Sequence, residues 1–484
     1  MELYDLTIEE AAKGIKNKEF SSADLTRAVM DRATALNPKI KAYLNLNGGT
    51  APKKADEVGQ RISEYNSPLA GVPVALKDNM TLKGSRTTAG SKILENYKPP
   101  YTATVIQKLL SAGAVIAGKT NLDEFAMGTS TENSGFYPTK NPWDESRVPG
   151  GSSGGSAAAV SAGMATYALG SDTGGSVRQP ASMCGVVGLK PTYGRVSRHG
   201  LIAMCSSFDQ IGPITRTVKD AGLVLNAISG FDARDSTTVK REDEDFTRGI
   251  EDGVRGLTVG VPKEFFADGL DKGVRDLVEK GIKDLEAQGA EIAAVSIPTF
   301  EYAIPVYYII VPVEVASNLG RYDGVKYGLS VYEDAKNLLD IYLKSRDAGF
   351  GAEVKRRIIL GTYVSSAGYF DAYYKKAVEV AQLMRGDFKK VFQSVDLLAG
   401  PTAPVPAFKI GEKSTDPLSL YLQDIYTAPA NIAGLPSISV PAGLSGGLPV
   451  GLQLIAPWWE EAKLLRCAYA FERANEYYKL RPKI

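Results

Sequence analysis

Three polar clusters in this chain contain residue types that together could cleave an acyl bond. Lys77 lies in PVALKDN, Ser152 in PGGSSGGS and Ser176 in GSDTGGSVRQP. A serine hydroxyl is a weak nucleophile and must pass its proton to a base as it attacks. The chain has 1 histidine, His199, so the base is expected to be something other than imidazole. A lysine desolvated at the end of a buried strand can be neutral near pH 7, and Lys77 follows an apolar run.

The glycines of these clusters suit a site at which the backbone approaches a substrate closely. The runs are flanked by apolar segments, residues 157–170 and 181–189, and a flexible linker is not usually embedded in core sequence. Residues 173–176, Thr-Gly-Gly-Ser, precede a predicted helix, so several backbone N–H groups could point at one oxyanion. Taken singly, Lys77 could be a surface lysine and the Gly-Ser runs could be loops. Taken together, they indicate a serine-dependent acyl-transfer site.

Residues 113–120, GAVIAGKT, match the phosphate-binding pattern GxxxxGK[ST]. That motif binds phosphate when a glycine-rich loop follows a strand. Here the residues between the glycines are themselves the best candidate strand, and a helix precedes them. We therefore predict a helix that stops at Gly113 and a buried strand after it, with no phosphate site.

A second motif, GGSSG at residues 150–154, matches the nucleophile pattern of α/β-hydrolases around Ser152 and again around Ser153. In those enzymes a catalytic histidine follows later in the chain. His199 comes early for that role and lies in a Gly- and Arg-rich stretch, RVSRHG. We favour a loop or surface histidine, and an esterase that depends on His199 is the alternative from another enzyme class.

Short apolar runs that alternate with helical patterns predict an α/β fold around a largely central sheet. The predicted strands are residues 73–76, 114–118, 165–170 and 257–262, with more after 396. The predicted helices are two within 6–36, which begin with the capping-box pairs Thr7/Glu10 and Ser21/Asp24, and one each in 102–113, 181–189 and 273–288. Residues 330–395 also have a helical pattern.

These patterns are interpreted as one large domain over residues 1–484. Its expected parts are N-terminal helices at about 1–66, a core at about 67–300 and 396–484, and a helical insertion at about 301–395. No disordered linker or internal repeat is found.

Composition favours a soluble cytoplasmic protein without a membrane role. The 484 residues include 56 basic and 55 acidic side chains and carry a net charge of +1, so a large nucleic-acid footprint on this chain alone is not expected. Cys184, Cys205 and Cys467 show no CxxC spacing, which indicates neither a disulfide framework nor a zinc site. The N-terminus lacks the apolar region of a signal peptide, and no segment approaches the roughly 20 apolar residues that span a bilayer.

The three clusters together resemble the motifs of the amidase signature family, and the resemblance covers almost the whole chain. It implies an α/β fold with a central mixed sheet covered by helices on both faces. It also implies a Ser–cis-Ser–Lys triad in which Ser176 is the nucleophile, Ser152 relays the proton and Lys77 is the terminal base. The implied oxyanion donors are the backbone amides of Thr173, Gly174, Gly175 and Ser176, and the implied supporting residues are Ser153, Ser171, Asp172 and Arg178.

Four segments, residues 121–134, 315–328, 351–377 and 421–441, resemble the A-type subunits of tRNA-dependent amidotransferases. This narrower resemblance implies a glutaminase that delivers ammonia to a B-type partner subunit, where Glu-tRNA(Gln), Asp-tRNA(Asn) or both are amidated with ATP. A small C-type subunit would bind both. The resemblance implies no cofactor or metal on this chain, with ATP, magnesium and most tRNA contacts on the partner.

Glutamine carries a carboxylate and an ammonium as well as its amide, so its pocket needs one group of each opposite charge. Arg356 and Asp424 suit these tasks, with Tyr307 as a polar wall. Each residue has a simpler interpretation: Arg356 could pair with Glu353 on a helix surface, Asp424 could be an exposed acid, and Tyr307 could be core packing. The alternative function is a stand-alone amidase of the same fold, and a non-catalytic scaffold subunit is disfavoured by the intact triad.

Overall fold

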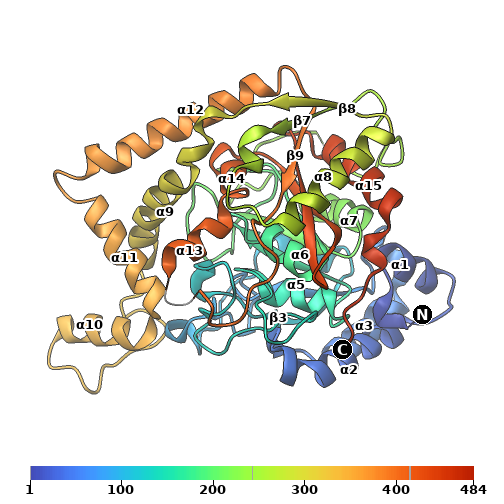
Figure 1. Ribbon diagram of the computed structural model, residues 1–484. Helices are drawn as coiled ribbons and strands as arrows, with labels where there is room; N and C mark the ends of the chain where they lie inside the picture. Colours follow the sequence, from blue (N-terminus) through green and yellow to red (C-terminus); the bar gives the residue numbers. More distant parts are fainter. Residues whose placement is uncertain (1, 243, 414–415) are drawn as a thin grey trace.

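The computed structural model describes residues 2–242, 244–413 and 416–484, and one mixed sheet of 11 strands runs through its centre (Figure 1). The strands are β1 (Tyr43–Leu46), β2 (Pro73–Lys77), β3 (Val115–Thr120), β4 (Tyr167–Asp172), β5 (Val187–Lys190), β6 (Gln210–Thr215), β7 (Thr258–Pro262), β8 (Glu291–Val295), β9 (Leu397–Pro401), β10 (Ser437–Ser445) and β11 (Leu448–Ile455). The predicted strands at 73–76, 114–118, 165–170 and 257–262 are therefore confirmed.

The strand order brings three strand ends together. The order is β1-β3-β2-β4-β6-β5-β10-β11-β9-β7-β8. Strand β2 pairs in parallel with both β3 and β4, whereas β4 pairs antiparallel with β6. The carboxyl ends of β2, β3 and β4 therefore meet at one edge of the sheet, which is where parallel sheets usually place their functional groups.

Both faces of the sheet are buried, and side chains of different size cover them. Val74 and Leu76 of β2 belong to the larger apolar core, whereas Ala75 between them belongs to a second core. The second core is rich in small residues, including Ala168 of β4 and residues 157–159. Alternate residues of a strand point to opposite faces of the sheet. The small side chains on one face let helices pack close to the sheet, and bulkier side chains fill the space on the other face. The predicted mixed sheet with helices on both faces is confirmed.

The helices surround this sheet. The α-helices are α1 (Ile8–Lys16), α2 (Ser22–Ile40), α3 (Ala51–Gln60), α4 (Thr104–Ser111), α5 (Gly154–Ser161), α6 (Arg178–Cys184), α7 (Val218–Ile228), α8 (Lys272–Ala287), α9 (Ala303–Leu319), α10 (Leu338–Gly349), α11 (Ala352–Val364), α12 (Lys376–Val391), α13 (Pro417–Tyr421), α14 (Ala428–Ala433) and α15 (Glu461–Asn475). Shorter turns include η3 (Lys92–Leu94), η4 (Glu124–Ala126), η6 (Pro298–Tyr302), η8 (Leu422–Asp424) and the π-helical turn η7 (Phe370–Lys375).

The N-terminal region follows its capping signals. Both predicted capping boxes form, Thr7 with Glu10 at the start of α1 and Ser21 with Asp24 at the start of α2. The region also contributes the edge strand β1, which pairs antiparallel with β3. Sequence pattern alone missed this strand, because it has only 4 residues.

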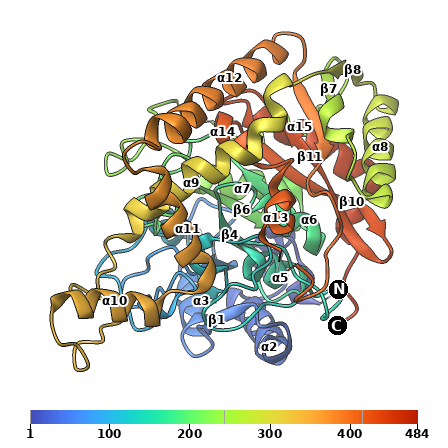
Figure 2. The ribbon, with the colours of Figure 1, turned by 60° about the vertical axis from the view of Figure 1, so that its left-hand side comes forward.

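The stretch between β8 and β9 holds the helices α9 to α12, and α10 lies at the outer end of the part that projects from the sheet (Figures 1 and 2). Pro298–Leu319, which joins η6 and α9, is long and apolar enough to cross a membrane by length and composition alone. The expectation that no segment reaches this length is therefore wrong. Half of the most apolar 18-residue part of that stretch is buried inside the protein, and α9 packs against α11 and α12 as a core helix does.

Two other sequence predictions meet different outcomes. The helix predicted over 181–189 is only partly correct, because α6 ends at Cys184 and Gly185 turns the chain with φ 68° into β5. The prediction of a strand in place of a phosphate loop at 113–120 is confirmed by β3. Lys119 of that strand is fully buried and forms an ion pair with Asp78 at 2.8 Å, so its ammonium faces the protein interior.

Candidate active site

Lys77 is the last residue of β2, and its side chain is fully buried. Its ammonium nitrogen Nζ lies 2.7 Å from Oγ of Ser152, 2.9 Å from Oγ of Ser153 and 3.2 Å from the carbonyl oxygen of Ser171. The end of a buried strand thus aims one amine at two hydroxyl groups. The structure brings Lys77 and Ser152 together as the sequence motifs predict.

Burial lowers the pKa of Lys77 to about 7, although the carboxylates of Asp123, Asp172 and Asp209 act in the opposite direction. Desolvation disfavours the charged form of an amine, and nearby negative charges restore part of that loss. A large fraction of Lys77 is therefore neutral near pH 7 and able to accept a proton.

Ser152 follows a cis peptide bond between Gly151 and Ser152. The N–H of Gly151 donates to Oε1 of Gln179 at 2.8 Å, and the carbonyl oxygen of Ser152 accepts from the N–H of Asp123 at 3.3 Å. A Cβ atom at residue 151 would lie 2.2 Å from Oδ2 of Asp123, so only glycine fits there. These contacts fix the backbone that carries the Ser152 hydroxyl.

Ser176 closes a turn that follows β4. Its carbonyl oxygen accepts from the N–H of Ser153 at 3.1 Å, which joins the two serine clusters. Gly175 has φ +145°, and a Cβ atom there would lie 2.2 Å from Oγ1 of Thr427. Within the described part of the chain, the N–H groups of residues 173–176 donate to no protein group. They are therefore free to stabilise an oxyanion.

A buried ion pair supports this turn from behind. Both side chains of the Asp172–Arg178 pair are fully buried, with Nη2 of Arg178 2.9 Å from Oδ1 of Asp172. Burial alone would raise the pKa of Asp172, but the guanidinium of Arg178 holds that pKa below its ordinary value. Arg178 also donates to the side chains of Gln453 and Asn431 and to the carbonyl oxygen of Thr427.

Ser171 and Ser153 complete the surroundings of Lys77. Oγ of Ser171 accepts from the amide of Asn79 at 2.9 Å, and the N–H of Ser171 donates to Oγ of Ser153 at 3.3 Å. All four residues expected to support the triad, Ser153, Ser171, Asp172 and Arg178, thus lie around it.

Asp209 is a further buried residue at this turn, and sequence reasoning missed it. Its Oδ1 accepts from the hydroxyl of Thr173 at 2.6 Å, and its Oδ2 accepts from the N–H groups of Met204 and Cys205. Burial raises the pKa of Asp209 to about 6, against the effect of these hydrogen bonds and of Arg198. Asp209 directly precedes β6, whose first residue Gln210 pairs with Asp172, and no sequence motif marks that register.

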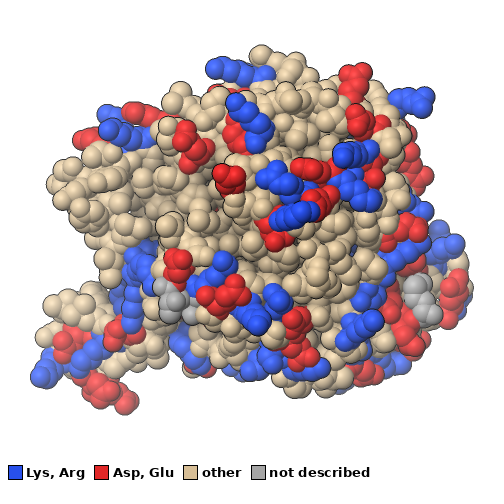
Figure 3. All heavy atoms as spheres, viewed as in Figure 1, with Lys and Arg blue, Asp and Glu red and all other residues tan. Residues whose placement is uncertain are grey.

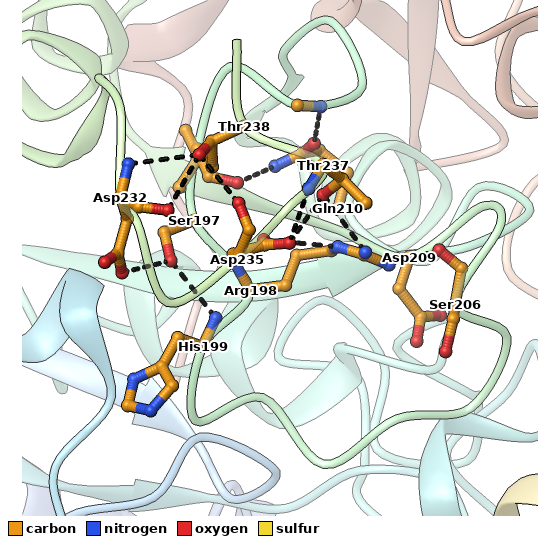
Figure 4. Close-up of polar contacts among 12 residues, drawn as sticks. Ser197, Arg198, His199, Ser206, Asp209, Gln210, Asp232, Asp235, Thr237 and Thr238 are labelled. Carbon is orange, nitrogen blue, oxygen red and sulfur yellow. Dashed lines mark hydrogen bonds and ion pairs between the residues drawn. The ribbon is translucent and has the colours of Figure 1, made fainter. Parts of the chain in front are cut away.

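His199 lies apart from the triad. Figure 4 shows it beside Ser197, to whose hydroxyl its backbone N–H donates at 3.1 Å. Its ring contacts Tyr101 at 5.3 Å between centroids, and its Nδ1 lies 3.4 Å from Oγ1 of Thr104. Among the described residues, neither Ser152 nor Ser176 hydrogen-bonds to this ring, so the arrangement gives no support to a histidine-dependent esterase.

A small cavity of about 120 Å³ lies between residues 128–133, α11 and α13, and its lining residues do not include Lys77, Ser152 or Ser176. Arg356 lines it, is about half exposed and forms an ion pair with Glu353, as the simpler interpretation anticipated. Arg357 also lines it but is buried, and its guanidinium lies over the rings of Tyr308 and Tyr421. Sequence reasoning missed Arg357, because adjacent arginines on a helix cannot be distinguished without the packing.

Asp424 is buried rather than exposed, and the hydroxyl of Tyr308 lies 3.4 Å from its Oδ2. Burial raises the pKa of Asp424 well above its ordinary value, and Arg357 opposes that shift. Tyr307 is buried too, with its ring stacked on Phe208, and a Cβ atom at Gly174 would lie 2.7 Å from its hydroxyl oxygen. Tyr307 therefore packs in the core and also borders the turn.

The described residues contain no group of three or more histidine, cysteine, aspartate or glutamate side chains that could hold a metal ion. The three cysteines are all buried and free.

Comparison with known proteins places this site in a family. The family profile described as Amidase matches residues 24–465. The A-type subunit of the glutamyl-tRNA(Gln) amidotransferase of Carboxydothermus hydrogenoformans is 57% identical over 486 residues, covering 100% of both chains. That of Thermoanaerobacter pseudethanolicus is 55% identical and covers 99% of this chain and 98% of the relative. The crystal structure of the same type of subunit from Thermotoga maritima is 45% identical, covers 98% of this chain and 95% of its own, and superposes with a TM-score of 0.81. The chain belongs to the amidase family.

Proposed function

We propose that this chain is the glutamine-hydrolysing A-type subunit of a cytoplasmic tRNA-dependent amidotransferase. It converts glutamine to glutamate and ammonia. A B-type partner subunit then uses the ammonia, with ATP and magnesium, to amidate Glu-tRNA(Gln), Asp-tRNA(Asn) or both, and a C-type subunit completes the complex. The full-length relatives, which are A-type subunits of glutamyl-tRNA(Gln) amidotransferases, support this proposal.

The chemistry begins at Ser176. Its hydroxyl attacks the side-chain amide carbon of glutamine, and its proton passes through Ser152 to the neutral amine of Lys77. The amide oxygen becomes an oxyanion that the N–H groups of residues 173–176 stabilise. As the C–N bond breaks, Lys77 returns the proton through Ser152 to the leaving nitrogen, and ammonia departs. Water then hydrolyses the acyl–Ser176 ester by the same route and releases glutamate.

The observation that carries this proposal is the contact between Lys77 and Ser152. Nζ of Lys77 lies 2.7 Å from Oγ of Ser152, and burial brings the pKa of Lys77 to about 7. A general base works best when its pKa lies near the working pH, so this amine can serve where histidine would in other hydrolases. The hydrogen bond from Ser153 to the carbonyl oxygen of Ser176 holds the nucleophile beside the relay serine.

The charges of Arg356, Arg357 and Asp424 suit free glutamine. In the proposed pocket Arg356 or Arg357 pairs with the α-carboxylate and Asp424 with the α-ammonium, with Tyr307 and Tyr308 as walls. A ligand ammonium would favour ionised Asp424 and so reverse the effect of burial on its pKa. An uncharged amide would leave these groups without partners, which disfavours a stand-alone amidase for apolar substrates.

The surface of the projecting helices supports membership of a multi-subunit complex. Many large apolar side chains of this region are exposed: Tyr332, Leu338, Leu339, Leu343, Ile359, Tyr363, Phe370, Tyr373 and Leu383. In Figure 3 much of the face over α11 carries few charged side chains, whereas charged side chains are visible over α12. Exposed apolar surface on this scale is typical of protein–protein interfaces. The net charge of +1 agrees with a division in which the partner makes most tRNA contacts.

The test is an amidation assay with two nitrogen donors on the complex formed with co-expressed B- and C-type subunits. We expect Ser176→Ala to abolish amidation driven by glutamine and to preserve amidation driven by ammonium chloride, because the partner's reaction needs only ammonia. Loss of both reactions, or of neither, would contradict the assignment of Ser176. Failure of the chain to co-purify with such subunits, together with hydrolysis of other amides, would favour the stand-alone amidase.

A further inference from the structure

The segment that follows β3, residues 121–133, joins the triad to helix α11. Its residue Asp123 faces the triad: its N–H donates to the carbonyl oxygen of Ser152, and its carboxylate accepts from the N–H groups of Thr131 at 2.9 Å and Asn133 at 3.1 Å. The next residue, Glu124, makes its contacts elsewhere. Its Oε1 accepts from the hydroxyl of Ser91 at 2.5 Å, and its Oε2 accepts from the N–H of Gly351 at 2.8 Å.

Gly351 is the N-cap residue of α11 and, being a glycine, has no side chain that could cap the helix. Glu124 therefore provides a hydrogen-bond acceptor at the start of this helix, and burial raises the pKa of its carboxyl to about 7. A Cβ atom at residue 351 would lie 2.5 Å from Oε2 of Glu124, so the two segments fit tightly. Ser91 reinforces the junction, because its hydroxyl also contacts the carbonyl oxygen of Gly349 at the end of α10.

The backbone next to Glu124 is held in an unusual conformation. Phe125 has φ 49° and Ala126 has φ 63°, both in the left-handed region that non-glycine residues rarely adopt. The ring of Phe125 packs on Phe350 at 5.8 Å and on Tyr322 at 5.0 Å between centroids. Such conformations persist where the surroundings over-determine them, commonly at functional sites. The segment thus holds the junction of α10 and α11 by polar and aromatic contacts together.

Helix α11 supplies charged residues of the cavity between residues 128–133, α11 and α13. Glu353, in its first turn, accepts from Nε of Arg357 at 2.8 Å and from the hydroxyl of Tyr421 at 3.0 Å, and it also pairs with Arg356. The start of α11 therefore sets the positions of both arginines. Glu124 holds that start but does not itself line the cavity.

We infer that Glu124 is a positioning residue for glutamine binding, which fixes α11 and through it the arginines that meet the substrate carboxylate. The inference rests on the proposed glutaminase function. Because Glu124 acts through α11 and not on the reacting atoms, its replacement should weaken substrate binding and leave the chemical step at Ser176 nearly unchanged.

Glu124→Gln tests this inference. The glutamine amide has nearly the size of the carboxylate, but its NH₂ group donates and would face either the Ser91 hydroxyl or the Gly351 N–H, so one hydrogen bond is lost. In the assembled complex we expect KM for glutamine to rise about fivefold to tenfold, as when about one hydrogen bond is lost, and kcat to stay within about twofold. Binding of glutamine to Ser176→Ala, with and without Glu124→Gln, should show the same ratio of Kd by calorimetry.

Asp220→Asn is the matched control. Asp220 is also a buried carboxylate that caps a helix from another element, since it accepts from the N–H groups of Ile8 at 3.1 Å and Glu9 at 3.3 Å at the start of α1. It contacts none of the residues placed in the site. Both substitutions should lower Tm, but Asp220→Asn should leave KM within about twofold, because a lost cap by itself reduces stability only.

Three results would overturn the inference: an unchanged KM in Glu124→Gln, a fall in kcat without a rise in KM, or an equal rise in KM in both variants. If Glu124→Gln does not fold, Ser91→Ala replaces it, since it removes one bond to Glu124 and should raise KM about twofold to threefold. An unchanged KM in a folded Ser91→Ala protein would then count against the inference. Absence of glutaminase activity in the unaltered complex would refute the proposed function instead, so the two failures are distinguishable.

Discussion

The burial of Lys77 predicts how glutamine hydrolysis depends on pH. Lys77 must be neutral to accept the proton of Ser152, and its pKa is lowered to about 7 chiefly by burial. Below that pH the ammonium form dominates and the base is lost. Between pH 8 and pH 6 the neutral fraction falls from about nine-tenths to about one-tenth, so kcat/KM should fall roughly tenfold. Initial rates of ammonia release at low glutamine concentration measure this quantity directly.

Lys77→Arg provides the control for the pH profile. An arginine in this position stays protonated throughout the range, so it can hydrogen-bond but cannot act as a base. We expect kcat to fall by about 100-fold to 10,000-fold, with no rise between pH 6 and pH 8 in what remains. A flat profile in the unaltered protein would refute the role of Lys77. So would a Lys77→Arg variant that kept both the rate and its pH dependence.

Three further predictions concern the turn, the buried ion pair and the histidine. Gly175→Ala should lower kcat by about 100-fold or more, because the methyl group would lie 2.2 Å from Oγ1 of Thr427 and displace the oxyanion donors; a kcat within about twofold of the unaltered value would contradict this role. Arg178→Met should lower the free energy of unfolding by about 3–5 kcal/mol, because it leaves Asp172 buried and unpaired. Urea denaturation measures that loss, and Lys272→Ala, which removes an exposed ion pair, is the comparison that should change little. His199→Ala should keep kcat/KM within about threefold, since its ring contacts Tyr101 and Thr104; loss of turnover would revive the histidine-dependent hydrolase.

The contact between Lys77 and Ser152 and the central sheet could be predicted from sequence motifs. Lys77 directly follows an apolar run that predicts a buried strand. The position of its side chain at the end of that strand is therefore restricted. Gly150, Gly151, Gly174 and Gly175 likewise indicate a close approach of the backbone, and two of them would clash with Asp123 or Thr427 if they carried a side chain. These features depend on residues near each other in sequence or on parallel strand pairing, which alternating apolar patterns express well.

The remaining parts of the site depend on contacts between distant segments. Asp209 meets Thr173 only because β4 and β6 pair antiparallel in a particular register. Arg357 is buried and Arg356 half exposed because α11 packs on α9 with one face, and a periodic pattern in a mixed helix does not fix that rotation. The sequence pattern also assigns residues of β5 to the end of a predicted helix. The end of α6 at Gly185 is not recognised, because this glycine lies within an unbroken apolar run.

The roles of Ser176 and Ser152 are distinguished by finding which serine carries the acyl group. The assembled complex is mixed with isotopically labelled glutamine, quenched with acid within the first turnover, digested and analysed by mass spectrometry. We expect a labelled γ-glutamyl ester on the peptide that contains Ser176, and none on the peptide that contains Ser152. An ester on Ser152, or one that still forms in Ser176→Ala, would show that Ser176 does not attack the substrate with Ser152 relaying its proton to Lys77.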